Sequence, residues 1–165
     1  MNAFWAYFWP PLGAGLVAGV IAGDFAFRGR WNRTLCIALG LAAAILSAAA
    51  WHGPLGGADE FSTTVERTIR QALVNNEIPE VSGHLHRGPL SRRVLLSGPA
   101  DDFQRGELIK LMNVVPGVES ASWSRGQGVP LIVEGSGASL LGFLFGLLVA
   151  YLRDKRRRYN AEWNW

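Results

Sequence analysis

The chain has 165 residues, of which 49% are hydrophobic and 18% are charged, and its net charge is +3. The positive excess lies outside residues 52–130, where eight Lys and Arg meet nine Asp and Glu, so this segment lacks the basic surface of a nucleic-acid-binding module. The single cysteine, Cys36, excludes an internal disulfide and a cysteine-rich metal site.

Asp, Glu, Lys and Arg are absent from three stretches of the chain, residues 1–23, 35–51 and 135–152. A helix of roughly 20 apolar residues crosses the hydrocarbon core of a membrane, so three transmembrane helices are predicted. The evenly charged segment between the second and third stretches is typical of a small folded domain. We therefore expect a membrane protein with three transmembrane α-helices and one small α+β domain outside the membrane.

The first two transmembrane helices are predicted at about 10–27 and 34–51, within residues 1–51. The first is expected to begin at Pro10 or Pro11, because proline is well accommodated in the first turn of a helix. No Lys or Arg precedes this apolar run, and a cleaved signal peptide is therefore not expected.

The third transmembrane helix and a basic tail are predicted in residues 130–165. Glu134 is expected in the first turn of this helix, at the depth of the lipid headgroups, where a carboxylate is tolerated far better than at the bilayer centre.

Small residues recur at helical spacing in the first and third spans, and small residues let helices approach closely in lipid. The sequence is consistent with two uses of these small-residue faces. They pack the three spans against one another, or they dock the chain onto another membrane protein. The predicted helix-packing set is Gly15, Gly19, Gly23, Gly142 and Gly146.

Basic residues flank the spans in the linker 24–34 and in the tail after Leu152. Because Lys and Arg are enriched in cytoplasmic loops, the linker and the C-terminus are expected in the cytoplasm. The N-terminus and residues 52–130 then face the opposite side, the periplasm if the membrane is a bacterial inner membrane. The residues expected to anchor this topology are Arg28, Arg30, Arg33, Arg153, Lys155, Arg156, Arg157 and Arg158.

The extramembrane domain is predicted at 59–128, after a Gly- and Pro-rich connector. Its first helix is expected to begin at Ser62 or Thr63, with a capping box that pairs Thr63 with Glu66. Apolar residues then follow at the spacing of one helix face, and these are Val65, Ile69, Ala72 and Leu73.

A β-hairpin is predicted next, with strands at 80–86 and 92–97. Asp101 or Asp102 is expected to cap a second helix, and Pro116-Gly117 is expected to end it. A third strand is predicted at 118–123, which gives the order α-β-β-α-β. The apolar face of the second helix is expected to consist of Phe103, Leu108, Leu111, Met112 and Val115.

Two motifs in this segment, Leu96-Ser97-Gly98 and Pro116-Gly117-Val118, resemble the BON domain family over roughly 62–125. The resemblance implies an α+β envelope module that binds phospholipid or another envelope component and uses no catalytic group or cofactor. BON domains often occur in tandem, whereas this chain has a single copy strung between membrane spans.

Arg87, Arg92 and Arg93 surround the predicted hairpin turn and are candidates for contact with lipid phosphates. A solvated loop is the alternative. His84 and His86 are expected on the same side of a strand, as two metal ligands would be, but no cysteine or carboxylate pair completes a site. We therefore expect no metal, cofactor or catalytic residue.

Taken together, these features predict a non-enzymatic inner-membrane protein whose BON-like module binds phospholipid or another envelope component. The alternative is a scaffold or accessory subunit that docks into a larger membrane complex through its glycine-rich first helix. The expected partners are membrane lipids and either another membrane protein or a second copy of the chain, but not nucleic acid.

Overall fold

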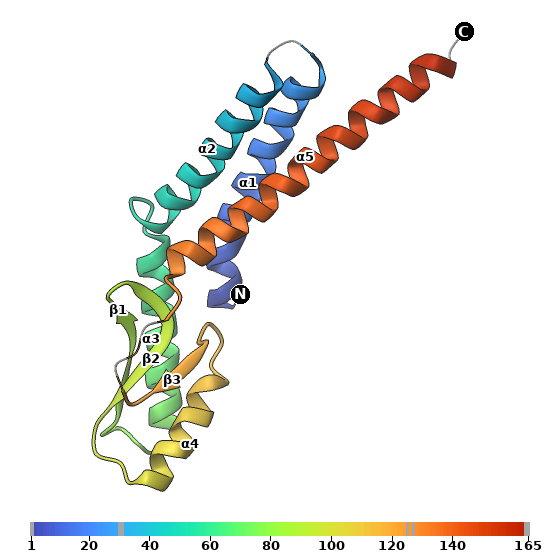
Figure 1. Ribbon diagram of the computed structural model, residues 1–165. Helices are drawn as coiled ribbons and strands as arrows, with labels where there is room; N and C mark the ends of the chain where they lie inside the picture. Colours follow the sequence, from blue (N-terminus) through green and yellow to red (C-terminus); the bar gives the residue numbers. More distant parts are fainter. Residues whose placement is uncertain (1, 30–31, 125, 127, 164–165) are drawn as a thin grey trace. The chain divides into compact units, whose positions relative to one another are not determined.

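The computed structural model describes residues 2–29, 32–124, 126 and 128–163. Its elements, in chain order, are α1 (Ala3–Phe27), α2 (Arg33–His52), α3 (Gly57–Asn75), β1 (Ser82–Arg87), β2 (Leu90–Ser97), α4 (Asp102–Asn113), β3 (Ser120–Ser122) and α5 (Leu131–Trp163) (Figure 1).

The chain divides into two compact units. The helical unit comprises Phe8–Leu55 and Gly135–Trp165, and therefore holds most of α1 and α5 and the whole of α2. The α/β unit comprises Met1–Tyr7 and Gly56–Glu134. Each unit is described by itself below.

Three helices in the described part of the chain, α1, α2 and α5, are long and apolar enough to cross a membrane. The prediction of three such helices is confirmed. The prediction that the first begins at Pro10 or Pro11 is wrong, because both prolines lie inside α1. The helix begins earlier because Asn2 caps it: the Asn2 side chain accepts from the Phe4 N–H at 3.1 Å and its carbonyl accepts from the Ala6 N–H.

Within the helical unit, α1 and α5 touch through their backbones at the glycines (Figure 1). A Cβ added at Gly15 would overlap the Ser139 carbonyl, and one added at Gly19 would overlap the Phe143 carbonyl. On α5, Cβ atoms at Gly142 and Gly146 would overlap carbonyls of α1. The glycines therefore act in pairs from both helices, and this close approach gains dispersion energy along the whole contact.

The second helix, α2, completes this packing. Gly40 lies against Ala22 of α1 and Phe143 of α5. The buried Ser139 hydroxyl donates to the Ala44 carbonyl at 2.8 Å, which ties α5 to α2 by a hydrogen bond. A polar bond between helices satisfies a group that lipid cannot satisfy.

Helix α3 of the α/β unit begins at Gly57, not at Ser62 or Thr63 as predicted. Gly56, with φ of 77°, turns the chain into the helix, and Asp59 and Glu60 place negative charge in the first turn, where the helix dipole favours it. Ser62 therefore lies inside the helix, and its hydroxyl donates to the Asp59 carbonyl.

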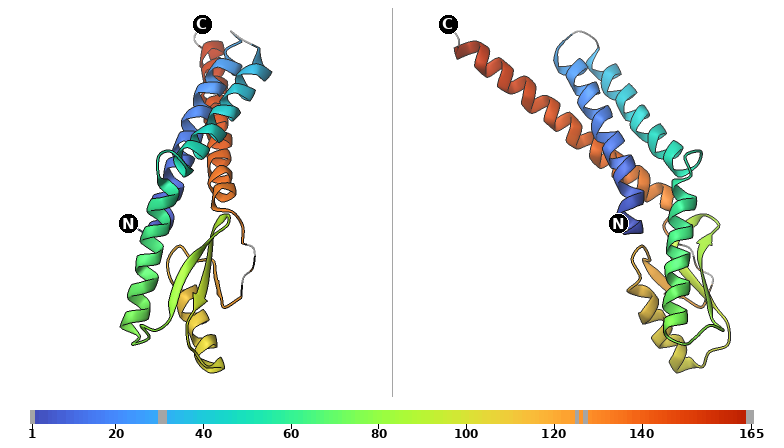
Figure 2. Two further views of the ribbon diagram at one scale, coloured as in Figure 1. Left: turned by 90° about the vertical axis from the view of Figure 1, so that its left-hand side faces the viewer. Right: turned by 180° about the vertical axis from the view of Figure 1, so that it is seen from behind.

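The order α3-β1-β2-α4-β3 is the predicted α-β-β-α-β order. Strand β2 is central: it pairs antiparallel with β1 and parallel with β3. Helix α3 lies behind the sheet in Figure 1 and in front of it in the reversed view of Figure 2. The core of this unit is formed by buried residues of α3 and of alternate strand positions: Val65, Ile69, Leu73, Leu85, Val94, Leu96 and Ala121.

Helix α4 begins as predicted, because Asp101 forms a capping box with Gln104. Its apolar face differs from the prediction. Leu108 and Met112 are buried, but Phe103 is 78% exposed. The reason is angular: Phe103 lies on the opposite side of the helix from Met112, at the usual 3.6 residues per turn.

The glycine contact can be tested by single methyl groups. Gly19→Ala should lower the free energy of unfolding by about 1–3 kcal/mol, because α1 and α5 must separate to admit the added Cβ. Gly13→Ala is the matched control on the same helix, because its added Cβ meets nothing within 4 Å. The measurement is unfolding of the full chain in mixed micelles, followed by circular dichroism. Equal losses at the two positions would contradict the described packing.

Candidate functional site

The three arginines predicted to meet lipid phosphates all belong to the β1–β2 hairpin, but the structure does not gather them. Arg87 is the last residue of β1, and Arg92 and Arg93 lie in β2. Successive residues of a strand point to opposite faces, so Arg92 and Arg93 diverge. Each of the three arginines contacts a different element.

Arg92 forms the tightest ion pair of the α/β unit. Its Nε donates to Oε2 of Glu134 at 2.6 Å, and the Arg92 side chain is only 19% exposed. Its guanidinium also lies 5.4 Å from the centre of the Phe4 ring. Glu134, which lies in the first turn of α5 as predicted, is the partner of this arginine. Arg92 therefore holds the hairpin to the first turns of α1 and α5.

Arg93 is engaged on the other face of the sheet. Its Nε donates to the Ser122 hydroxyl at 3.0 Å, which ties β2 to β3. The guanidinium also lies so close to Gly126 that a Cβ there would meet it. The contacts of Arg93 are thus with its own sheet and the loop that follows it.

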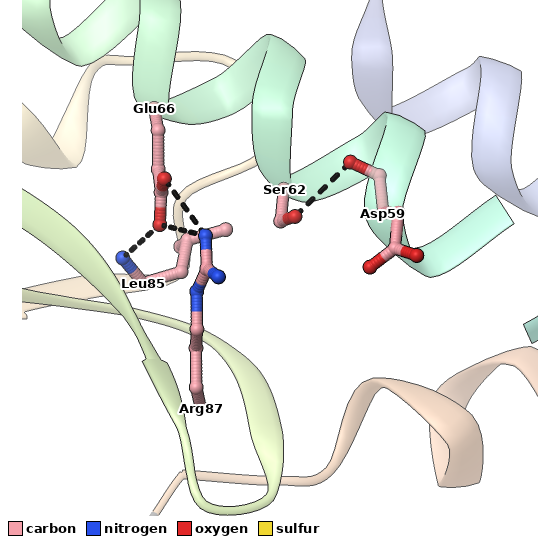
Figure 3. Close-up of polar contacts among 5 residues, drawn as sticks. All are labelled: Asp59, Ser62, Glu66, Leu85 and Arg87. Carbon is pink, nitrogen blue, oxygen red and sulfur yellow. Dashed lines mark hydrogen bonds and ion pairs between the residues drawn. The ribbon is translucent and has the colours of Figure 1, made fainter. Parts of the chain in front are cut away.

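Of these three arginines, Arg87 has the most exposed side chain. Its Nη2 contacts both oxygens of Glu66, at 3.2 and 3.0 Å, and its side chain remains 66% exposed (Figure 3). Glu66, from α3, is only 16% exposed. The carboxylate therefore fixes the position of a guanidinium that still faces solvent.

Glu66 has a second role at the edge of the sheet. Its Oε1 also accepts from the Leu85 N–H at 3.2 Å (Figure 3). Strand β1 is an edge strand, and its pairing with β2 shifts register between Leu85 and Arg87. A side-chain acceptor at this point satisfies a backbone donor and protects the edge from pairing with another chain.

Beside this contact, α3 and β1 enclose a groove of about 290 Å³. Its polar lining comes from Glu66, Arg70, Ser82 and His84. His86 does not line this groove, and its Nδ1 lies 3.2 Å from the Pro89 carbonyl oxygen. Among the described residues, no three His, Cys, Asp or Glu side chains are placed to hold a metal ion.

The six residues on which the predicted resemblance to BON domains rests lie at the ends of two elements. Gly98, after β2, has φ of 137°, and a Cβ there would meet the Glu80 carbonyl. Gly117, after α4, has φ of 99° and lies against Val65. Both conformations favour glycine. Of the other motif residues, Leu96 is buried and Pro116 is exposed. The Ser97 and Ser82 hydroxyl oxygens are 2.9 Å apart, and the Val118 N–H donates to the Val115 carbonyl.

The basic residues that flank the spans gather at one end of the helical unit. Arg33, at the start of α2, lies over the ring of Phe27, and Arg158 of α5 donates to the Phe27 carbonyl at 3.3 Å. Arg28 pairs with Asp24 in the last turns of α1. Arg30 lies outside the described residues. The remaining members, Arg153, Lys155, Arg156 and Arg157, are exposed on α5.

A groove of about 710 Å³ runs between α1 and α2. It is separate from the contact of Gly15 and Gly19 with α5 described above. Its lining combines large apolar residues, such as Val17, Ile21, Phe25 and Leu39, with small ones, which include Gly13, Ala14, Ala18, Ala22, Gly40 and Ala43. Sequence reasoning noticed the small residues but could not tell which of them face α5 and which stay open.

Comparison of the chain with protein-family models, with curated proteins and with solved structures finds no match in any of the three.

The Glu66 contact generates a prediction about the α/β unit. Glu66→Ala should destabilise the unit by about 1–2 kcal/mol, because it removes an ion pair and leaves the Leu85 N–H without its acceptor. Hydrogen exchange of the full chain, resolved at the Leu85 amide, measures this directly. Glu119→Ala is the control, because Glu119 is exposed. Unchanged exchange at Leu85 in the Glu66 variant would contradict the contact.

Proposed function

We propose that this chain is a non-enzymatic inner-membrane protein whose BON-like module, residues 59–128, faces the periplasm and binds phospholipid headgroups or another anionic envelope component. The observation that carries the proposal is the placement of Arg87, which is held by Glu66 and two-thirds exposed.

A guanidinium has five N–H donors, and the contact with Glu66 uses those of Nη2 alone. The Nε and Nη1 donors remain for a phosphate oxygen, with which arginine forms strong charge-assisted bonds. Because Glu66 already restricts the side chain, binding a headgroup loses less conformational entropy than it would for a free arginine. Arg70 and His84 line the adjoining groove and add donors on the same side of α3 and β1.

The proposed orientation is supported by the gathering of both basic clusters at one end of the helical unit. Lys and Arg prefer the cytoplasmic side of a membrane. Because the linker after α1 and the tail of α5 lie at the same end of the helical unit, a single orientation places both of them in the cytoplasm. The segments at the opposite ends of α1, α2 and α5 then meet the periplasm, and the α/β unit is attached to them.

A second candidate function is that of a scaffold or accessory subunit within a larger membrane complex. The groove between α1 and α2 favours it, because Gly13 in its lining has nothing within 4 Å and leaves room for a further helix to approach. The stripe of Gly15 and Gly19, which the sequence offered for this purpose, is occupied by α5 of the same chain. The docking surface in this alternative is therefore the α1–α2 groove.

The orientation can be measured with single cysteines in a Cys36→Ala background. Glu119→Cys in the α/β unit should react with a membrane-impermeant maleimide in intact cells, whereas Tyr159→Cys in α5 should react only after the cells are permeabilised. Both positions are exposed in the structure, so their reactivity reports the side of the membrane. Labelling of position 159 but not 119 in intact cells would reverse the proposed topology.

Headgroup binding can be measured with the full chain in phosphatidylcholine nanodiscs, immobilised through a C-terminal tag. Fluorescent vesicles that contain phosphatidylglycerol should be retained, and Arg87→Gln should lower retention about fivefold, since one basic residue contributes about 1 kcal/mol at an anionic surface. Arg67→Gln removes the same charge from an exposed position of α3 and is the control. Equal retention by the two variants would remove Arg87 as the contact.

A further inference from the structure

Helix α4 turns an unusual stripe toward solvent. Phe103 and Val114 are 78% and 80% exposed, and they lie at the two ends of the stripe. Between them, Glu107 and Lys110 form an ion pair at 2.8 Å. At 3.6 residues per turn these four residues fall within a narrow arc of the helix surface, opposite the buried Leu108 and Met112.

The order of this stripe is self-complementary. Phe103 and Val114 are equidistant from the midpoint between Leu108 and Ile109, and so are Glu107 and Lys110. A twofold axis through that midpoint lays one α4 antiparallel on another. Phe103 then meets Val114 of the second copy, and Glu107 meets Lys110. Apolar groups face apolar groups and each charge faces its opposite, as an isologous interface requires.

The two flanks of the stripe differ, with Gly106 on one side of it and Leu111 on the other. The twofold axis places both Leu111 side chains on one side of the contact and both Gly106 residues on the other side. Leu111 is only partly buried in its own chain, and a Cβ at Gly106 would meet nothing within 4 Å. One flank of the contact is therefore apolar and the other is open.

A groove of about 460 Å³ extends the same surface toward the end of α3, where Asn76 and Ile78 join its lining. The surface thus has apolar area beyond one helix. Two copies anchored in one membrane are held at high effective concentration, so an interface of this modest size is sufficient for pairing.

We infer that two copies of the chain pair through α4, antiparallel and across a twofold axis, with Phe103 on Val114 and Glu107 on Lys110. The partner is a second copy because the stripe is complementary to itself when it is reversed: apolar residues then face apolar residues, and each charge faces its opposite. A partner of different sequence gives no reason for this symmetry.

Disulfide trapping of the full chain in membranes tests the register. In a Cys36→Ala background, chains carrying Phe103→Cys are co-expressed with differently tagged chains carrying Val114→Cys. The mixed disulfide should exceed the Phe103→Cys homodimer about tenfold, because symmetry places identical positions about 16 Å apart, beyond disulfide reach. Absence of the mixed disulfide, or a dominant homodimer of either variant, would overturn the antiparallel pairing.

Charge reversal separates this pairing from docking of another protein. Glu107→Lys alone and Lys110→Glu alone each place like charges opposite one another, and each should lower trapping between positions 103 and 114 about fivefold. Co-expression of the two reversed chains restores opposite charges, as does the double swap in one chain, and both should return trapping to the wild-type level. Glu119→Lys is the control for the change in net charge. Failure of the paired reversals to restore trapping would overturn the second copy as the occupant.

Discussion

The backbone contact between α1 and α5 is the constraint on which the rest of the structure depends. Gly19 and Gly146 have no side chains that would hold the two helices apart. Gly15 and Gly142 extend the same contact, so the two backbones touch at each of these glycines. Because α1 precedes and α5 follows both α2 and the α/β unit along the chain, their contact joins segments that are far apart in the sequence. A domain of about 70 residues buries only about 60% of its unfolded surface and is marginally stable alone. Tying both of its ends to packed helices lowers the entropy of its unfolded state.

The charged residues of the α/β unit join segments that are distant in sequence. Arg92 links β2 to Glu134 at the start of α5, and Glu66 links α3 to the edge strand β1. Glu66 is far less exposed than its partner Arg87, and Glu134 is about as buried as its partner Arg92. Loss of either arginine would therefore leave a poorly hydrated carboxylate without its ion-pair partner. The exposure of Arg87 differs from this pattern: it takes its position from Glu66 but is itself largely solvated. That asymmetry is why we propose Arg87, and not Arg92 or Arg93, as the arginine that binds a headgroup.

The sequence predicted the elements better than their ends or contacts. Uncharged stretches of about the length that a membrane-spanning helix needs identify α1, α2 and α5, and the spacing of Val65, Ile69 and Leu73 identifies α3. The start of α1 was missed because Asn2 is an adequate cap and apolar helices tolerate internal proline. Phe103 was misplaced because apolar character was taken as burial. The partners of Arg92 and Glu66 were out of reach, since they lie 42 and about 20 positions away and no local pattern encodes them.

Three surfaces of the chain are distinct in the structure. Gly15 and Gly19 of α1 are covered by α5, a groove lies between α1 and α2, and the exposed stripe of α4 carries a symmetric order of charges. The α4 stripe shares no residue with Glu66 or Arg87, so pairing through it leaves the proposed headgroup contact available on both copies. Two such contacts on one assembly act together, and the second engages at the effective concentration set by the first. Pairing through α4 would therefore strengthen the proposed attachment of Arg87 to an anionic surface, which gives the pairing a physical consequence for binding.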